Sequence, residues 1–209
     1  MVGAGNVGLI VSYQLLQAGV EVAAVVEALP EFGGYHVHAA KIRRLGVPIL
    51  TRHTVVRALG EERVEGAVIA RVDERFEPIP GTERELEVDL VCLAIGLTPS
   101  TRLLEQAGAG MAYVAELGGR VPLHDERMET TVAGIYVAGD CAGIGEASTA
   151  ILEGRLAALA VLERMGRDVG RDKAEAQASL IRLRAGPFGA RPRQGKEKLR
   201  TLLKEVACG

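Results

Sequence analysis

The sequence predicts an α/β fold, on three observations. Hydrophobic residues make up 48% and charged residues 25% of the 209 residues, a composition that allows a packed core and argues against global disorder. Aromatic residues are only 3% and tryptophan is absent, so the core must consist mainly of Val, Leu, Ile and Ala, which suits a buried parallel sheet covered by helices. The first fifty residues also alternate apolar strand-like runs with helical patterns, as a doubly wound sheet does.

The elements of the first half follow one another as strand, helix, strand, helix and strand. A helix is expected after the first glycines because apolar residues recur at helical spacing, and Gly19 is well placed to end it. Gly46 ends the second helical pattern in the same way. The expected elements are a strand stub at 1–2, helices at 6–18 and 35–45, and strands at 20–27 and 47–50. This order is the βαβαβ half of a Rossmann-like fold.

The glycine-rich start of this half predicts a dinucleotide site. Gly3, Gly5 and Gly8 fit the pattern GxGxxG: the first makes a tight turn, the second admits a pyrophosphate to the backbone, and the third lets helix and strand pack closely. The start of the helix offers free N–H groups and a positive dipole end to phosphates. Glu27 lies at the end of the second strand, where a carboxylate can bind both ribose hydroxyls and would repel a 2′-phosphate. We therefore expect NAD(H), not NADP(H), to be held by Gly3, Gly5, Asn6, Val7, Gly8 and Glu27.

Beyond residue 50 the apolar pattern changes from helical spacing to alternation. The runs 53–59, 63–72 and 84–95 look like three antiparallel strands joined by polar turns. Such a β-meander is unusual in simple dehydrogenases. The first predicted domain, a Rossmann-like NAD-binding half with a β-meander and a truncated first strand, covers residues 1–96.

The second half contains a different signature of nucleotide binding. A buried strand is expected from Leu90 to Ile95, ending in Gly96, and a helix begins near Ser100. Another strand is expected over 135–138, followed by Gly139, Asp140, a glycine-rich loop and a long apolar helix over about 146–165. An acid at the end of a parallel strand, beside a helix N-terminus, is placed to bind ligand hydroxyls.

These stretches resemble the pyridine nucleotide-disulfide oxidoreductase superfamily, of the thioredoxin reductase-like type. The stretch "CLAIGLTP" is similar to the motif at the crossing between the NAD and FAD domains, and "TTVAGIYVAGD" is similar to the C-terminal FAD motif. Within that group, "GAGNVGLIVSYQLLQAGVEVAAVVEA", "GGYHVHAAKIRR" and "LRAGPFG" look most like α-subunits grouped with sarcosine, opine and amino-acid dehydrogenases. The resemblance covers residues 1 to about 165 well and the tail loosely.

The resemblance implies a flavin site in the second half. Gly139 and Asp140 would lie at the ribitol and pyrophosphate of FAD, Gly96 belongs to the crossing motif, and Gly154 would allow close helix packing. Ala147, Ser148 and Thr149 would lie near the flavin ring. Thioredoxin reductases have Arg-Gln-Ala there, so thioredoxin is a poor guess for the substrate. Residues 97–166 would then be the C-terminal segment of an FAD-binding domain, and 167–209 a basic helical tail.

The function that follows is an FAD-dependent pyridine-nucleotide oxidoreductase, or a fragment or subunit of one, that passes electrons between NAD(H), flavin and an unknown substrate or partner subunit. No side chain stands out as a catalytic acid, base or nucleophile. Two alternatives stay open: an NAD-dependent dehydrogenase without flavin, and a non-catalytic truncated nucleotide-binding or assembly subunit.

The strand ahead of the glycines has only two residues, Met1 and Val2, and the superfamily's own first GxGxxG, for the ADP part of FAD, is absent. Losing a central strand would leave buried backbone groups of its neighbours unpaired, at roughly 1–3 kcal/mol each. We therefore expect Met1 to be an internal methionine of a longer flavoprotein, or another polypeptide to supply the missing N-terminal FAD-binding segment. An oligomer is expected.

The charge and cysteine content of the chain bear on its partners, on metal sites and on its cellular location. The net charge is −2, which gives no case for nucleic acid, although residues 166–209 hold eleven basic and five acidic residues. This tail predicts two short helices, at 172–184 and 195–206, with a break between them. Their apolar residues are expected to form docking faces: Leu180, Ile181, Leu183, Leu199, Leu202 and Leu203.

The three scattered cysteines support neither a disulfide framework nor a metal site and fit a cytoplasmic setting. No stretch reaches the roughly 18 apolar residues of a membrane span.

Overall fold

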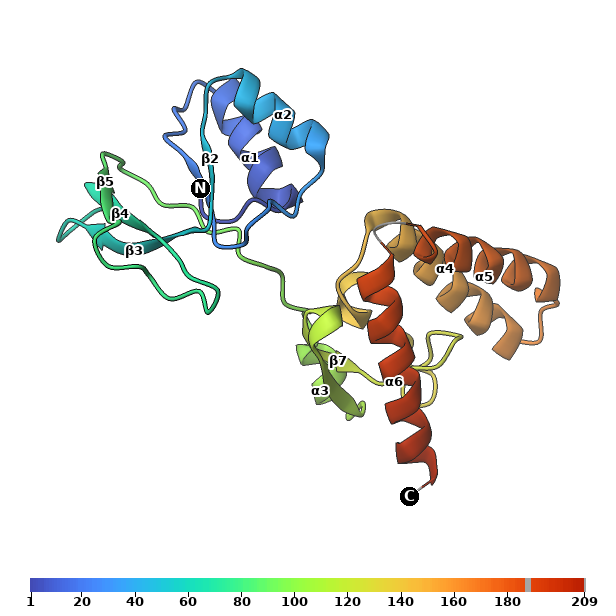
Figure 1. The fold of residues 1–209 in the computed structure, drawn as a ribbon. Coiled ribbons are helices and arrows are strands. Elements are labelled where there is room, and N and C mark those ends of the chain that lie inside the picture. The colour runs from blue at the N-terminus through green and yellow to red at the C-terminus, as the bar shows by residue number, and fades with distance from the viewer. Residues whose placement is uncertain (187–188, 209) are drawn as a thin grey trace. The chain divides into compact units, whose positions relative to one another are not determined.

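The computed structural model describes residues 1–186 and 189–208, and these form two compact units whose boundary falls between Gly96 and Leu97 (Figure 1). Helices and short sheets occur in both, so the predicted α/β fold is confirmed. The first unit contains α1 (Asn6–Gln17), β1 (Val25–Glu27), α2 (His36–Arg44), β2 (Ile49–Thr51), β3 (His53–Leu59), β4 (Gly66–Arg71) and β5 (Arg84–Leu86). The second contains α3 (Arg102–Gln106), β6 (Met111–Val114), β7 (Gly119–Pro122), α4 (Ala147–Arg164), α5 (Gly170–Arg184) and α6 (Ala190–Cys208), with short 3₁₀ helices η1 (Ala115–Leu117) and η2 (Gly139–Ala142).

A small parallel sheet organises the first unit. β1 pairs with β2 in parallel, and Val2 forms parallel bridges with Val26 on one side and Leu93 on the other. The order across this sheet is therefore β2, β1, the Met1–Val2 stub and the segment at Leu93. Helices α1 and α2 lie side by side against it (Figure 1). A core of Ala4, Leu9, Val25, Ala39, Ile42 and Val47 joins the helices to the strands.

Two strands of this unit are shorter than the sequence predicts. β1 covers 25–27 instead of 20–27. The predicted buried strand from Leu90 to Ile95 is wrong: the segment makes one bridge, at Leu93, and Leu90 and Ile95 are 61% and 72% exposed. The reason is the same in both cases. A strand needs a neighbour to pair with, and here only Val2 lies between the two segments.

The β-meander is confirmed as an antiparallel sheet in the order β3, β4, β5. Its third strand ends at Leu86, so the predicted run of 84–95 divides into β5 and the segment that reaches Val2. Buried Ile69 on β4 packs with Ala24 and Val26, which joins the meander to the parallel sheet.

The second unit is built around the long helix α4. α4 and α5 lie side by side, and α6 runs along the β6–β7 hairpin and η1 (Figure 1). The sequence does not predict this hairpin. The predicted strand at 135–138 is also wrong, because only Tyr136 makes a bridge, antiparallel to Glu129, before the chain turns into η2.

The tail packs into the second unit through both of its helices. Leu180 and Leu199 are buried, and Leu202 and Leu203 pack partly buried near η1, whereas Ile181 and Leu183 are exposed, so the docking face expected for α5 is only partly correct. The predicted break is shorter than expected because α6 already begins at Ala190. Pro192 is tolerated there because the first helical turn needs no backbone donor. Pro187 and Phe188 of the "LRAGPFG" stretch lie outside the described residues.

Candidate functional site

Two of the three glycines in the first turn are required by the fold. Gly3 has φ +101°, and a Cβ there would lie 2.3 Å from the carbonyl oxygen of Ala94. A Cβ on Gly8 would lie 2.0 Å from the carbonyl oxygen of Gly3. The chain therefore folds back on itself so tightly that no side chain fits at either position.

Gly5 is different, because neither its conformation nor its packing requires glycine. Its φ of −74° and ψ of 180° suit any residue, and a Cβ there would meet nothing within 4 Å. The missing side chain instead leaves the backbone open to approach from outside. Gly34, just before α2, supports the turn from the other side: its N–H donates to Ala4 O, and a Cβ there would lie 2.9 Å from the Gly5 carbonyl carbon.

The start of α1 presents unpaired backbone donors. The first helical hydrogen bond runs from Leu9 N–H to Gly5 O, and within the described chain the N–H groups of residues 5–8 donate to no acceptor. No acidic residue lies in the first turn. The Oδ1 of Asn6 accepts the N–H of Tyr35 at 2.8 Å, which fixes the loop beside the turn, while Val7 is half exposed. Unpaired donors at the positive end of a twelve-residue helix suit an anion such as a phosphate.

Glu27 connects the end of β1 to the glycine turn. Its Oε2 accepts the N–H of Ala4 at 2.8 Å and its Oε1 accepts the N–H of Leu29 at 3.0 Å. The structure thus brings Gly3, Gly5, Asn6, Val7, Gly8 and Glu27 into one cluster. Gly96 is separate from it: it has φ +129° and ends the first unit, two residues after Ala94.

The second cluster of predicted residues lies where η2 meets α4. Gly139 has φ +72°, and Asp140 is exposed, with its Oδ1 accepting the N–H of Gly145 at 3.4 Å. Ala147 and Ser148 are exposed in the first turn of α4, and their N–H groups have no acceptor in the part of the chain that the structure describes.

Thr149 and Gly154 of α4 also have predicted roles. The hydroxyl of Thr149 donates to Glu146 O at 2.7 Å, so it closes the first turn of the helix. The packing role predicted for Gly154 is wrong, because a Cβ there would meet nothing within 4 Å in the described chain.

A buried carboxylate holds this second cluster in place, and sequence reasoning missed it. Glu153 is 3% exposed, and its Oε2 accepts the N–H of Gly139 at 2.8 Å. Its Oε1 accepts hydrogen bonds from Arg184 of α5 and from Lys196 of α6, the latter at 3.1 Å. The signal in the sequence was an acid on the apolar stripe of α4, three residues before Leu156.

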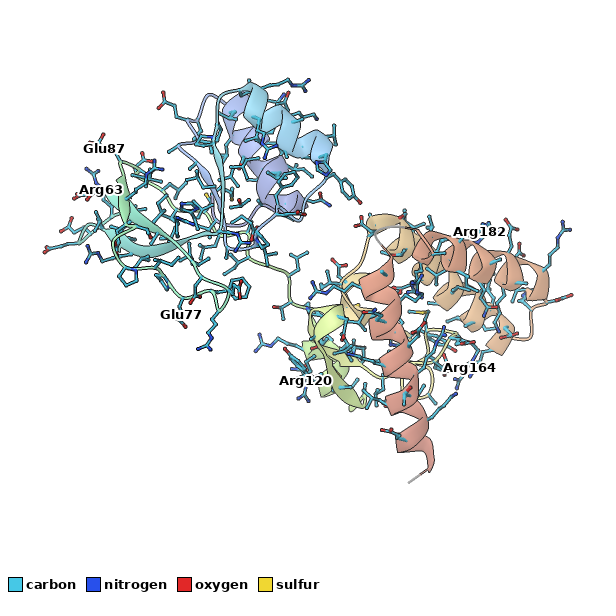
Figure 2. All side chains as sticks on the ribbon, in the orientation of Figure 1. Arg63, Glu77, Glu87, Arg120, Arg164 and Arg182 are labelled. Atoms are coloured by element: carbon cyan, nitrogen blue, oxygen red, sulfur yellow. The ribbon has the colours of Figure 1, made fainter. Side chains whose placement is uncertain are left out.

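Lys196 connects Glu153 to Ala142 of η2 and to His124. Its Nζ donates to Ala142 O at 2.9 Å and lies 3.1 Å from Nε2 of His124. Burial lowers the pKa values of both Lys196 and Arg184, and the Glu153 carboxylate opposes that shift. The other ion pairs are more exposed, as for Arg164 of α4 with Glu129 (Figure 2), where the arginine side chain is 56% exposed. Both helices of the tail therefore reach the turn that carries Gly139 and Asp140.

His124 gives the second unit a predicted pH dependence. Burial, and next the Lys196 cation, lower its pKa from 6.5 to about 3. Between these two pH values the imidazole of His124 is protonated in the unfolded chain and neutral in the folded chain. The contribution of His124 to stability is therefore fully present above the higher value and is lost as the pH decreases through this range.

We expect the free energy of unfolding to fall by up to about 1.4 kcal/mol per pH unit from this group. Urea unfolding of the native chain and of His124→Asn, compared between about pH 7 and about pH 4.5, measures it. The variant should show a shallower slope; equal slopes in the two proteins would show that His124 is not the titrating group.

The pattern of the Pyridine nucleotide-disulphide oxidoreductase family matches residues 1–154. The chain belongs to this family. The family's members are oxidoreductases that use FAD and a pyridine nucleotide, as the sequence analysis expects. The two clusters above lie inside the matched range.

Individual relatives agree with the family. The chain is 35% identical over 152 residues to an opine oxidase subunit of Rhizobium meliloti, covering 72% of this chain and 31% of that protein. It is 30% identical over 149 residues to an NADH oxidase of Streptococcus pyogenes, covering 71% of this chain and 30% of that protein. The chain spans about a third of the length of these curated relatives.

A solved structure supports the fold. The thioredoxin reductase of T. acidophilum superposes with a TM-score of 0.66 at 24% identity, covering 79% of this chain and 52% of that chain. Among the described residues, no helix is both long enough and apolar enough to cross a membrane.

Proposed function

We propose that this chain carries the pyridine-nucleotide site and part of the flavin site of an FAD-dependent oxidoreductase, which moves electrons between NAD(H), flavin and a substrate or partner subunit. The observation that carries the proposal is the open glycine turn of the first unit. The four N–H groups of residues 5–8 are unpaired, and the missing side chain of Gly5 leaves them open to a ligand. Glu27 lies beside them. Backbone donors for a dinucleotide pyrophosphate and a carboxylate acceptor for the ribose hydroxyls are thus present together.

Each residue of the turn has a distinct role in this proposal. The N–H groups of residues 5–8 bind the pyrophosphate, and Glu27 accepts hydrogen bonds from the ribose hydroxyls. Because Glu27 already accepts the N–H of Ala4, ribose recognition and the shape of the turn depend on one carboxylate. Its negative charge disfavours a 2′-phosphate, so we propose NAD(H) as the nucleotide.

The second cluster fits one end of FAD. Asp140 is an exposed acceptor for flavin-side hydroxyls, and the free N–H groups of Ala147 and Ser148 can donate to the ring or to a phosphate. FAD, when bound, supplies the acceptor for hydride from NADH. The chain's own residues bind and orient the two cofactors, and we assign none of them as an acid or base.

The relatives suggest how such a chain is used. The opine oxidase relative is by its name one subunit of an enzyme. We propose that this chain too acts with a partner subunit, in an oligomer. Free Cys92 and Cys141 suit a reducing compartment, so we place the protein in the cytoplasm.

Anaerobic addition of NADH to the FAD-loaded protein tests the proposed activity. We expect the oxidised flavin absorbance to bleach, and we expect a partner or dye to restore it. If the protein binds NADH but retains no flavin under any loading condition, it is a nucleotide-binding protein without flavin chemistry and the proposal fails. If substrate turns over with NAD⁺ while flavin is absent, the flavin-free dehydrogenase is correct.

Replacing Glu27 by Gln tests the choice of nucleotide. The amide keeps the size of the side chain but removes the charge that repels a 2′-phosphate, so the preference for NADH over NADPH should shrink by about tenfold, which is about 1.4 kcal/mol. Calorimetric titration of both nucleotides measures the ratio. Glu31→Gln is the matched control, because Glu31 is exposed on the loop that follows. An unchanged ratio in Glu27→Gln, or an equal change in the control, would exclude Glu27 as the ribose acceptor.

A further inference from the structure

The second unit contains a pocket of about 220 Å³ where helices α4, α5 and α6 meet the loop that follows β7. One face of α5, on which Gln177, Leu180 and Arg184 recur at helical spacing, forms part of its wall. Lys196 and Leu199 line it from α6 in the same way. The volume is that of about seven water molecules at roughly 30 Å³ each, so the pocket is large enough for a small organic molecule.

One part of the lining is apolar. Leu156, Leu180 and Leu199, one from each of the three helices, are 2%, 6% and 1% exposed, and Met128 of the loop is 4% exposed. Ile181 also lines the pocket and is itself exposed to solvent. These side chains offer an apolar surface on which the methylene groups of a ligand can be buried favourably.

Arg184 lines the pocket and has unpaired donors. Its Nη2 donates to Oε1 of Glu153, whereas its Nε is buried without a partner and its Nη1 donates to no group in the described chain. The amide of Gln177, on the same face of α5, adds a second polar group to the lining. Buried donors in folded proteins nearly always have a partner, so an acceptor that reaches Arg184 is favoured, and most of all a charged one.

Two buried cations of the lining share one carboxylate. Arg184 and Lys196 both donate to Oε1 of Glu153, the latter from a distance of 3.1 Å between Nζ and this oxygen. Burial lowers the pKa values of both cations. Each is therefore stabilised by any further negative charge placed close to it.

The other charged groups that line the pocket balance one another. Asp125 pairs with Arg127 at 2.9 Å, and Glu126 pairs with Arg200 at 3.2 Å. Burial lowers the pKa of His124 to about 3, so this imidazole is neutral at pH 7. Only the two buried cations exceed their carboxylate, which leaves the pocket with one positive charge in excess. This excess favours a ligand with a single negative charge.

We propose that this pocket binds a small aliphatic monocarboxylate, whose carboxylate group pairs with Arg184 and whose hydrocarbon chain packs on the three buried leucines. The volume sets the size at about seven or eight non-hydrogen atoms, as in hexanoate. A dicarboxylate has more negative charge than the excess cation balances, and an uncharged apolar molecule leaves Arg184 unpaired. The inference does not depend on nucleotide or flavin binding.

Titration of the isotope-labelled native chain with hexanoate tests this inference. The methyl resonances of Leu156, Leu180 and Leu199 should shift in a saturable manner. Hexanamide has the same chain without the charge, and acetate has the charge without the chain, so each should bind at least about tenfold more weakly. Binding of either one as tight as that of hexanoate would overturn the proposal. Absence of saturable shifts at these methyl groups would overturn it as well.

Replacing Arg184 by Met tests the assigned residue. The change leaves Lys196 and Glu153 as a one-to-one ion pair and should lower the affinity for hexanoate by at least about tenfold. Arg182→Met is the matched control, because Arg182 lies on the same helix and is exposed (Figure 2), and its affinity should stay within about twofold of the native value.

Circular dichroism establishes whether both variants are folded. Unchanged affinity in folded Arg184→Met, or an equal loss in Arg182→Met, would show that Arg184 does not bind the carboxylate and would overturn the proposal. If Arg184→Met does not fold, the comparison of hexanoate, hexanamide and acetate on the native chain decides.

Discussion

Replacing Glu153 by Ala is expected to lower the free energy of unfolding of the second unit by about 3–5 kcal/mol, because the change leaves two buried cations without their carboxylate. Arg184 and Lys196 both donate to Oε1, and the N–H of Gly139 loses its acceptor as well. The side-chain Nε of Arg184 already has no hydrogen-bond partner, so the network has no spare acceptor among the described residues. Urea unfolding followed by circular dichroism measures the loss.

Glu163→Ala is the control for this effect. Glu163 lies on the same helix and its Oε2 accepts a hydrogen bond from Lys173 at 2.6 Å, but its side chain is 45% exposed. An exposed pair of this kind contributes up to about 1 kcal/mol. If Glu153→Ala lowered the free energy of unfolding no more than Glu163→Ala does, the buried network would not be what fixes the position of η2.

A combined variant separates the network's stability from its geometry. Replacing Glu153, Arg184 and Lys196 together by Leu, Met and Met removes all three charges and should recover much of the lost stability, as replacement of buried ion pairs by apolar residues often does. Loss of flavin binding in this variant despite recovered stability would assign the network to positioning Gly139 and Asp140. Retained flavin binding would limit the network to a structural role.

Replacing Gly8 by Ala is expected to destabilise the first unit by at least about 3 kcal/mol and to abolish NADH binding. The new Cβ would lie 2.0 Å from a backbone oxygen, that of Gly3, which is itself fixed by its N–H bond to Val26 O. The turn can relieve this contact only by moving α1 away from β1. Thermal unfolding and NADH titration of the same preparations measure the two effects.

Gly5→Ala is the matched control within the same motif. Its Cβ meets no atom within 4 Å, so Tm should stay within about 2 °C of the native chain. NADH affinity should nevertheless fall by about tenfold or more, because the methyl group stands where the pyrophosphate approaches. Unchanged NADH affinity in Gly5→Ala would mean that the dinucleotide does not approach the turn from this side.

The sequence predicts the first cluster well because its signals are local. The spacing of Gly3, Gly5 and Gly8 sets the turn, and Gly19 and Gly46 end helices through left-handed backbone that only glycine adopts easily. Helix α4 follows from its long apolar run. The predicted roles of these residues in cofactor binding stay predictions until the titrations are made.

Features that depend on distant partners could not be predicted in this way. The segment from Leu90 to Ile95 has the composition of a buried strand, yet it pairs only at Leu93, since a strand forms only where a neighbour supplies hydrogen bonds. Glu153 and Lys196 are 43 residues apart in the chain, and neither spacing nor composition links them. Gly195 likewise allows α6 to approach η1, where a Cβ would lie 2.6 Å from Leu117 Cγ.

Binding of a pyridine nucleotide at the glycine turn beside Glu27 is tested most directly by titration of the isotope-labelled chain with NADH. Amide resonances of residues 3–8 and 27–29 should shift in a saturable manner, and NADPH should bind more weakly at the same amides. Absence of saturable shifts, or shifts confined to residues outside this turn, would show that the nucleotide does not bind at the glycine turn.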